Sequence, residues 1–344
     1  MEEMLDIYLR GKENKRTVAS SVADTKSRGI KMLLYYFVTL IVSPYIKISD
    51  TVFYVNGSYK KFRDIGEIEG CQNIYRGYKY STIREISSIP TFFSSMKRRQ
   101  RFRVVHQALA SYRKYKKRGV ILSTWLEFNV LSEFMKTSHI KLILIRGHYD
   151  DVTTWIGDLS KLYGIRVVMY QHGVVSERIT IPYKIRCDKI NVFDNYSKNI
   201  FKNQYVDNED CQYCIYPFKP SCLMQDKQYS TKYAIGIAEQ CNFDWVNRII
   251  LLIRSMHLDC TIFVMPHPNS HYKESGDNII VTSDKVKNMD VLITENSTLA
   301  LDYYRANNKQ EIIYTDDFEE YKDYPFHYCD TDEKLIKALS DALE

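Results

Sequence analysis

Short apolar runs alternate with longer, helix-like stretches through the first half of the chain. The runs are rich in Val, Ile, Leu or Tyr and are too short for buried helices, so they predict strands. Strands that alternate with helices indicate βαβ units and a parallel sheet. The predicted strands are residues 51–55, 120–123, 142–145, 166–170 and 189–193, and the clearest helices between them are residues 125–137 and 153–163.

The same pattern restarts after a break. Residues 203–233 are polar, include Pro217 and Pro220 and lack a clear period, which predicts a link between two domains. We therefore predict an α/β protein of two Rossmann-like domains that face a central cleft, with residues 1–215 in the first domain, residues 230–330 in the second and a C-terminal helix over residues 331–344. Strands are predicted at 233–237, 261–265, 278–282, 291–294 and 311–314, and helices at 244–256, 297–305 and 331–343.

Length and charge add two constraints. The chain has 344 residues, which at roughly 150 residues per domain fits two domains, and its net charge is +6. Much of the positive charge falls within residues 97–118, where it could attract nucleic acid, anionic lipid or a phosphorylated substrate, or form a solvated helix face. No DNA- or RNA-binding motif accompanies it, so we do not expect a nucleic-acid partner. The basic residues are Lys97, Arg98, Arg99, Arg101, Arg103, Arg113, Lys114, Lys116, Lys117 and Arg118.

The start of the chain indicates a cytoplasmic protein. Residues 1–30 are polar and charged, unlike a secretory signal. Residues 32–42 are apolar but shorter than the about 20 residues that a transmembrane helix needs. With Lys31 and Lys47 on either side, this run suits a segment lying on the inner face of an anionic membrane, although a buried core helix is the commoner explanation.

The cysteines do not indicate a metal site. The chain has 8 Cys, and in a reducing cytosol we expect mostly buried thiols rather than disulfides. Cys211 and Cys214 have the spacing of half a zinc site, but no second pair matches them.

A candidate catalytic motif follows the predicted strand 166–170. It reads Gln171-His172-Gly173, and a neutral histidine at a strand end can take a proton from a sugar hydroxyl near pH 7. Gly173 would let a substrate approach closely, and Glu177 could orient or assist the histidine. The alternative is a structural histidine at a turn. Asp150, in the acidic pair after strand 142–145, is a weaker candidate for contact with substrate.

Two motifs in the second half indicate an anion site. Pro266 and Pro268 flank His267 and restrict its backbone, which suits a pre-aimed imidazole that binds a donor phosphate. An ordinary proline-rich loop is the competing explanation. Asn296-Ser297-Thr298 lies between a predicted strand and helix, where hydroxyls and free backbone N–H groups can bind phosphate or form a plain N-cap. No Gly-rich phosphate loop and no nucleophile elbow are present.

Taken together, His172-Gly173, His267-Pro268 and Ser297-Thr298 resemble the motifs of a group of bacterial surface-polysaccharide transferases. The group includes capsule and lipopolysaccharide sialyltransferases, polysialyltransferases, capsular Kdo transferases and CDP-glycerol glycerophosphotransferases. The resemblance covers about residues 166–321 in order and spacing.

This resemblance implies a metal-independent GT-B glycosyltransferase without a cofactor. It implies that His267, Ser297 and Thr298 bind the nucleotide phosphate. Pro268 and Asn296 would belong to the same nucleotide site, with Glu239 near the nucleotide. His172 would be the catalytic base, with Glu177 assisting it, and Gln171, Gly173 and Asp150 would lie against the substrate.

The donor that we favour is a CMP-activated acidic sugar, sialic acid first, then another nonulosonate or Kdo. The acceptor is a glycan, lipid-linked in one reading, in capsule or O-antigen synthesis. The Gln-His-Gly form is closer to the glycerophosphotransferases, so a CDP-glycerol or CDP-ribitol phosphotransferase stays open. A non-catalytic scaffold of the polysaccharide assembly machinery is the alternative from another class.

Overall fold

The fold is described from a computed structural model of the chain. For residues 15–18, 51–55, 72–73, 89–91, 146 and 305–307 only the backbone is described. The described residues are 2–18, 34, 36–39, 45, 51–55, 72–73, 89–146, 150–171, 175, 177, 180–207, 210–215, 224–267, 270–273, 276–295, 297, 299–307, 310–316 and 324–344.

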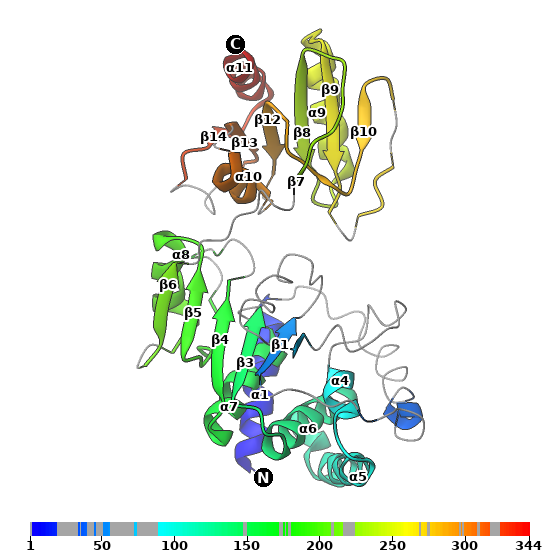
Figure 1. The fold of residues 1–344 in the computed structure, drawn as a ribbon, viewed down its shortest axis with the longest axis vertical. Helices are drawn as coiled ribbons and strands as arrows, with labels where there is room; N and C mark the ends of the chain where they lie inside the picture. The colour runs from blue at the N-terminus through cyan, green and yellow to red at the C-terminus, as the bar shows by residue number, and fades with distance from the viewer. Residues whose placement is uncertain are drawn as a thin grey trace. The chain divides into compact units, whose positions relative to one another are not determined.

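The chain forms two compact units, an N-terminal unit of Met1–Tyr216 and a C-terminal unit of Pro217–Glu344. Each contains its own parallel sheet with helices packed against it (Figure 1). In the N-terminal unit the strand order is β2-β1-β3-β4-β5-β6. These strands are β1 (Thr51–Val55), β2 (Gln72–Asn73), β3 (Leu142–Arg146), β4 (Arg166–Tyr170), β5 (Lys189–Val192) and β6 (Gln212–Ile215).

The helices of the N-terminal unit pack around one apolar core. Its centre is aromatic: Trp125 and Phe128 stack with ring centroids 5.4 Å apart, and Tyr8 stacks on Trp155 at 5.6 Å. Burying large aromatic side chains gives this core much of its stabilisation. The helices are α1 (Glu2–Val18), α4 (Ile89–Ser94), α5 (Arg98–Tyr115), α6 (Leu122–Thr137), α7 (Asp151–Tyr163) and α8 (Asn195–Ile200), with short helical turns at Lys116–Arg118 and Phe201–Tyr205.

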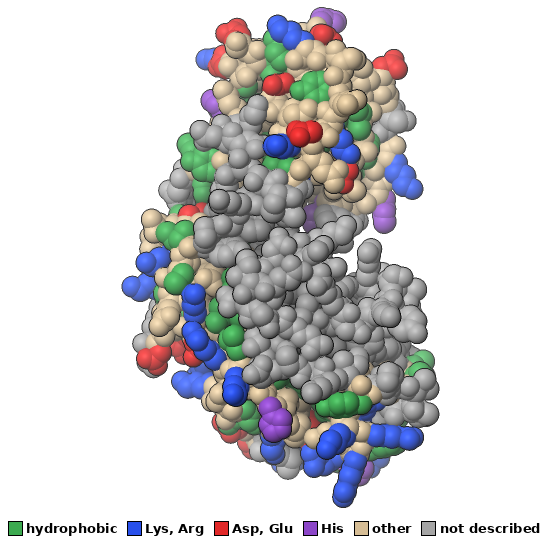
Figure 2. All heavy atoms as spheres, viewed as in Figure 1, with side chains coloured by type: hydrophobic (Ala, Val, Ile, Leu, Met, Phe, Trp, Pro, Cys, Tyr) green, Lys and Arg blue, Asp and Glu red, His purple; other side chains and the backbone are tan. Residues whose placement is uncertain are grey.

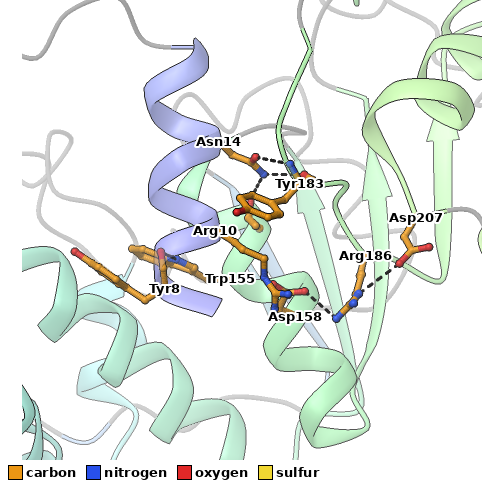
Figure 3. A network of polar contacts seen from close by, with 9 residues as sticks. Tyr8, Arg10, Asn14, Trp155, Asp158, Tyr183, Arg186 and Asp207 are labelled. Carbon is orange, nitrogen blue, oxygen red and sulfur yellow. Dashed lines mark hydrogen bonds and ion pairs between the residues drawn. The ribbon is translucent and has the colours of Figure 1, made fainter. Parts of the chain in front are cut away.

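Polar contacts join α1 to the rest of this unit (Figure 3). Arg10 pairs with the buried Asp158 of α7 at 2.9 Å. Asn14 is fully buried, and its amide bonds both the carbonyl oxygen and the N–H of Tyr183, at 2.9 and 3.1 Å. Because a buried polar group must find partners, these bonds fix where α1 lies against α7.

The sheet of the C-terminal unit has the order β10-β9-β8-β12-β13-β14. Side chains along β8 point alternately into two apolar clusters. Ile235 and Ile237 pack with α9 and α11, whereas Ala234 and Ala238 belong to the cluster that includes Tyr303 of α10. Helices therefore cover both faces, as parallel sheets require. The elements are β7 (Met224–Gln225), β8 (Tyr233–Ala238), α9 (Phe243–Ser255), β9 (Cys260–Met265), β10 (Ile279–Val281), β11 (Lys285–Val286), β12 (Val291–Thr294), α10 (Leu299–Asn307), β13 (Gln310–Tyr314), β14 (His327–Cys329) and α11 (Asp332–Leu343); β7 pairs with β11.

One predicted strand is wrong, and the segment predicted as a link contains a strand as well. The predicted strand 120–123 is absent, because Ile121 is the extended N-cap of α6 and the helix begins at Leu122. Residues 203–233 are not only a link: β6 lies within them and pairs with β5. The sequence did not indicate β6 because its short apolar run, residues 213–215, stands within a polar segment that lacks a clear period.

The prediction of mostly buried thiols is also wrong in part. Cys260 and Cys329 are buried, but Cys241 is exposed. Cys187, Cys211 and Cys214 are half-buried.

Residues 32–42 are helical where they are described, and only one face is buried. Tyr36 and Thr39 are 1% and 5% exposed, whereas Leu34, Phe37 and Val38 are 60%, 49% and 58% exposed. The simple core-helix interpretation is therefore incomplete. Among the helices of the described residues, none has the length and apolar character needed to cross a bilayer.

Candidate functional site

The carboxyl ends of three neighbouring strands bring together the polar residues of the C-terminal unit. Strands β9, β8 and β12 are adjacent, and Glu239, His267 and Ser297 follow them. The backbone N–H of Glu239 donates to the carbonyl oxygen of Met265 at 3.1 Å, and that of His267 donates to the carbonyl oxygen of Glu239 at 3.0 Å. The ladder thus continues one residue beyond β8 and holds Glu239 and His267 side by side.

Glu239 is fully buried, and its two carboxylate oxygens differ. Oε2 accepts from the backbone N–H of His267 at 3.2 Å. Oε1 has no hydrogen-bond partner among the described residues. An unsatisfied buried oxygen is costly in a native structure, so its position calls for a functional explanation. It provides an acceptor for a ligand that brings an N–H or O–H group.

His267 is half-buried and its ring also has a neighbour. Nδ1 lies 3.9 Å from Sγ of Cys241, in the loop between β8 and α9. Cys241 has a φ of 65°, in the left-handed region that favours glycine. Such a conformation costs of order 1–3 kcal/mol and tends to occur at functional sites. The strained backbone of Cys241 and the His267 ring therefore lie in the same loop cluster.

Ser297 lies two residues before Leu299, where α10 begins. Its Oγ accepts from the backbone N–H of Leu299 at 3.2 Å, and its own N–H donates to Oγ1 of Thr294 at 3.0 Å. The Ser297 hydroxyl thus bonds the first N–H group of α10, and its assignment to a phosphate site stays a prediction. A second helix, α9, begins at the end of β8, where the Asn242 side chain accepts from the backbone N–H of Trp245 at 3.2 Å. The amino ends of both helices, which attract anions, thus follow the carboxyl ends of adjacent strands.

In the N-terminal unit, Gln171 follows β4 and is 1% exposed. Its Nε2 donates to Oγ of Ser197 at 3.0 Å, and its Oε1 accepts from the backbone N–H of Phe193 at 2.8 Å. These bonds lock the end of β4 to the end of β5 and the start of α8. Gln171 therefore anchors the backbone at the carboxyl end of β4.

Asn191 is a polar residue that sequence reasoning missed. It lies in β5 opposite Tyr170 of β4, is 6% exposed, and its Nδ2 has no hydrogen-bond partner among the described residues. The signal was an uncharged polar residue inside an otherwise apolar strand. Its amide is a second buried group whose hydrogen bonds a ligand could complete.

Asp150 and Glu177 are placed differently from one another. Asp150 is the N-cap of α7, and its Oδ1 accepts from the backbone N–H of Thr153 at 2.7 Å. A carboxylate is a strong N-cap, so a structural role accounts for this aspartate. Glu177 is exposed in a turn. Further site predictions lie outside the described residues: His172, Gly173, Pro268, Asn296 and Thr298.

The described site residues are suited to binding an anion and a polar ligand. They combine helix amino ends, a half-buried imidazole and a buried carboxylate acceptor. In the parts of the chain that the structure describes, His, Cys, Asp and Glu side chains do not gather in threes as metal ligands would. Of the predicted CxxC pair, Cys211 lies against Cys187, with 3.6 Å between the sulfur atoms.

No protein-family model and no curated protein sequence matches the chain. Solved structures do resemble the chain. A UDP-GlcNAc 2-epimerase from Methanocaldococcus jannaschii, in complex with UDP-GlcNAc and UDP, is 12% identical with a TM-score of 0.51, over 86% of this chain and 93% of that one. The wall teichoic acid polymerase TagF is 12% identical with a TM-score of 0.50, over 92% of this chain and 90% of that one. The likeness confirms the predicted fold: this chain is an α/β protein of the GT-B type with two Rossmann-like domains.

Proposed function

We propose that this chain is a glycosyltransferase that moves an acidic sugar from a CMP-activated donor to a glycan hydroxyl in the synthesis of a surface polysaccharide. The buried, unpartnered Oε1 of Glu239 carries this proposal. The GT-B fold and the motifs around His267 and Ser297 support it. Sialic acid is the preferred donor sugar, ahead of another nonulosonate or Kdo.

The chemistry of Glu239 favours cytosine over uracil. A carboxylate oxygen accepts from the N4 amine of cytosine, as Glu and Asp do in base recognition. Uracil presents an acceptor at the same position, which a carboxylate would repel. The ribose hydroxyls are a further set of donors that this oxygen suits. A phosphate group would not bind at this oxygen, because the carboxylate and the phosphate are both anions and repel each other.

The phosphate of the donor would instead lie against His267 and the amino end of α10. His267 can donate a hydrogen bond from its ring, and the helix end offers backbone N–H groups beside Ser297. A CMP leaving group carries a single phosphate, so these groups can meet its charge. We therefore propose that turnover needs no metal ion.

The N-terminal unit would bind the acceptor. In this proposal His172 removes the proton of the acceptor hydroxyl as it attacks the anomeric carbon, and the configuration inverts. Gln171 positions the histidine by locking β4 to β5, and Asn191 supplies a buried amide for the acceptor. NMR of the product that shows a retained anomer would contradict the inverting step.

Titration calorimetry with CMP, CDP, UDP and GDP, with EDTA present, tests the donor class. Binding of CMP or CDP alone supports the proposal, and release of CMP from CMP-sugars then separates it from transfer of a CDP-polyol. That phosphotransferase is the second candidate, since the TagF structure that resembles this fold was soaked with CDPG. A preference for UDP or GDP would overturn the cytidine donor. No nucleotide binding would favour the scaffold interpretation.

We also propose that one face of the N-terminal unit contacts an anionic membrane. Lys and Arg side chains gather over α5 in Figure 2, and Lys97, Arg98 and Arg99 are exposed. Exposed apolar residues lie near them, because Arg101 in α5 donates to the carbonyl oxygen of Thr39 at 3.2 Å. Apolar groups beside cations are typical of surfaces that bind lipid. The exposed apolar residues are Leu34, Phe37, Val38 and Phe102.

A further inference from the structure

Two thiols lie side by side at the amino ends of β5 and β6, the edge of the sheet away from Gln171. The sulfur atoms of Cys187 and Cys211 are 3.6 Å apart, and both residues are half-buried free cysteines. If the register of Lys189 with Gln212 is extended by one residue, Cys211 lies opposite Asp188, the neighbour of Cys187. For strands about 4.8 Å apart this gives a Cα separation of roughly 6 Å, within the range that a disulfide spans.

Backbone hydrogen bonds hold both cysteines in place. Next to Cys187, the N–H of Asp188 donates to the carbonyl oxygen of Val167 at 2.9 Å, and Oδ2 of Asp188 accepts from the Val167 N–H at 2.6 Å. Next to Cys211, the N–H of Gln212 donates to the carbonyl oxygen of Asp188 at 2.9 Å. These hydrogen bonds fix the backbone on the strand side of both cysteines.

The other side of Cys187 is equally constrained. Arg186 pairs with Asp158 of α7 at 3.2 Å and with Asp207 at 3.4 Å (Figure 3). Gly157 of α7 approaches so closely that a Cβ there would lie 2.5 Å from the carbonyl oxygen of Arg186. A bond between the sulfur atoms would thus need only small side-chain movements.

The two thiols have different acidities. The pKa of Cys187 is raised well above its usual value, first by its hydrogen bond with Cys211 and then by burial. The hydrogen bond from Cys187 lowers the pKa of Cys211, and a hydrogen bond with Tyr213 lowers it further. Because the thiolate is the reactive form, Cys211 is the nucleophile of the pair.

A cavity of about 170 Å³ reaches one member of the pair, Cys187. Cys187 lines it together with Ser160 of α7, Arg186 and Asp188. It lies within the N-terminal unit, at the amino ends of the strands. None of the residues predicted to bind donor or acceptor lines it.

We propose that Cys187 and Cys211 form a reversible dithiol–disulfide pair that a low-molecular-weight disulfide such as oxidised glutathione oxidises. The Cys211 thiolate attacks one sulfur of the small disulfide, whose S–S bond breaks and releases one thiolate. Cys187 then loses its proton and attacks Sγ of Cys211, which releases the second small thiol. Two protein thiols become one disulfide, and one small disulfide becomes two thiols.

The test incubates the full-length protein in glutathione buffers that range from reduced to oxidised. We expect wild type to lose two hydrogens without retaining glutathione, with a non-reduced digest joining the peptides of Cys187 and Cys211. The oxidised form should melt at a higher temperature than the reduced form, because a cross-link restricts the unfolded chain. Cys214→Ser is the matched control and should behave as wild type does, since Cys214 lies on β6 outside the pair.

Single variants test the order of attack. Cys187→Ser should trap glutathione on Cys211, because no second thiol is left to release it. Cys211→Ser should leave Cys187 largely unmodified. Phenylarsine oxide, which bridges two neighbouring thiols, should bind reduced wild type and neither variant at this site. Wild type that keeps a mixed disulfide, or that links other cysteines while Cys187 and Cys211 stay reduced, would overturn the proposal. It is independent of the proposed transferase activity.

Discussion

The backbone N–H of His267 donates to both the main-chain carbonyl oxygen and the side-chain Oε2 of Glu239, at 3.0 and 3.2 Å. The two hydrogen bonds thus fix His267 and Glu239 relative to each other at the ends of β8 and β9. The carboxylate is held in one orientation, and its Oε1 stays without a partner in the described structure. The His267 ring and Oε1 of Glu239 consequently lie at the same edge of the sheet. A single substitution at either residue tests its role.

His267→Ala should weaken CMP binding by about 1.5–3 kcal/mol, the contribution of a hydrogen bond to a charged group. Titration calorimetry measures the change directly. His327→Ala is the matched control, because His327 is exposed on β14. An unchanged dissociation constant for His267→Ala would remove this histidine from the donor site.

Glu239→Gln tests the roles of the two carboxylate oxygens independently. The amide oxygen can keep the bond to the N–H of His267, but the other position becomes an NH₂ donor that faces the donor groups of the nucleotide. We expect the affinity for CMP to fall at least tenfold, while UMP loses less or gains, since uracil presents an acceptor. Equal losses for CMP and UMP would show that Glu239 contacts the ribose or only supports the fold.

His172→Ala should abolish sugar transfer and leave the dissociation constant of CMP nearly unchanged. The reason is that a general base acts on the acceptor hydroxyl and does not hold the nucleotide. Activity assays with matched titrations separate the two effects. His139→Ala, an exposed histidine of the same unit, is the control. A collapse of CMP affinity in His172→Ala would contradict the assignment of this residue as the base.

Sequence patterns predicted most of the sheet strands because buried parallel strands are continuous apolar runs. β4 and β12, for example, begin and end at the predicted residues. The same logic failed at residues 120–123, where apolar residues precede a helix, and at β6, whose short apolar run stands within a polar segment. Local composition cannot distinguish such cases, because tertiary packing decides them.

The site was predictable only in part. Motif positions placed Glu239, His267 and Ser297 at strand ends, and the structure brings the first two into direct contact. The unpartnered oxygen of Glu239 and the amide of Asn191 could not be predicted, since both depend on what the folded chain leaves unsatisfied. The pairing of Cys187 with Cys211 depends on strand register, which cysteine spacing does not encode.

Membrane contact is tested with vesicles of anionic and neutral lipid. Phe37→Ser with Val38→Ser should weaken binding to anionic vesicles, because both side chains are exposed and apolar beside the basic helix α5. High salt should weaken the binding of wild type, since the electrostatic part is screened. Leu251→Ser is the control, an apolar residue 65% exposed on α9. A wild-type protein that does not bind anionic vesicles would contradict the membrane proposal.

Glu311 should make stability fall as pH rises. It lies in β13 at 2% exposure, and burial raises its pKa from 4.5 to about 8. Between these values the folded protein holds a proton that the unfolded chain releases, so the stabilisation is complete below about pH 4.5 and is lost as pH rises towards 8. Glu311→Gln removes this proton, so its advantage over wild type should grow by up to about 1.4 kcal/mol per pH unit across that window. Urea unfolding at pH 5, 6.5 and 8 measures it. Parallel curves for the two proteins would show that Glu311 is charged in the folded state.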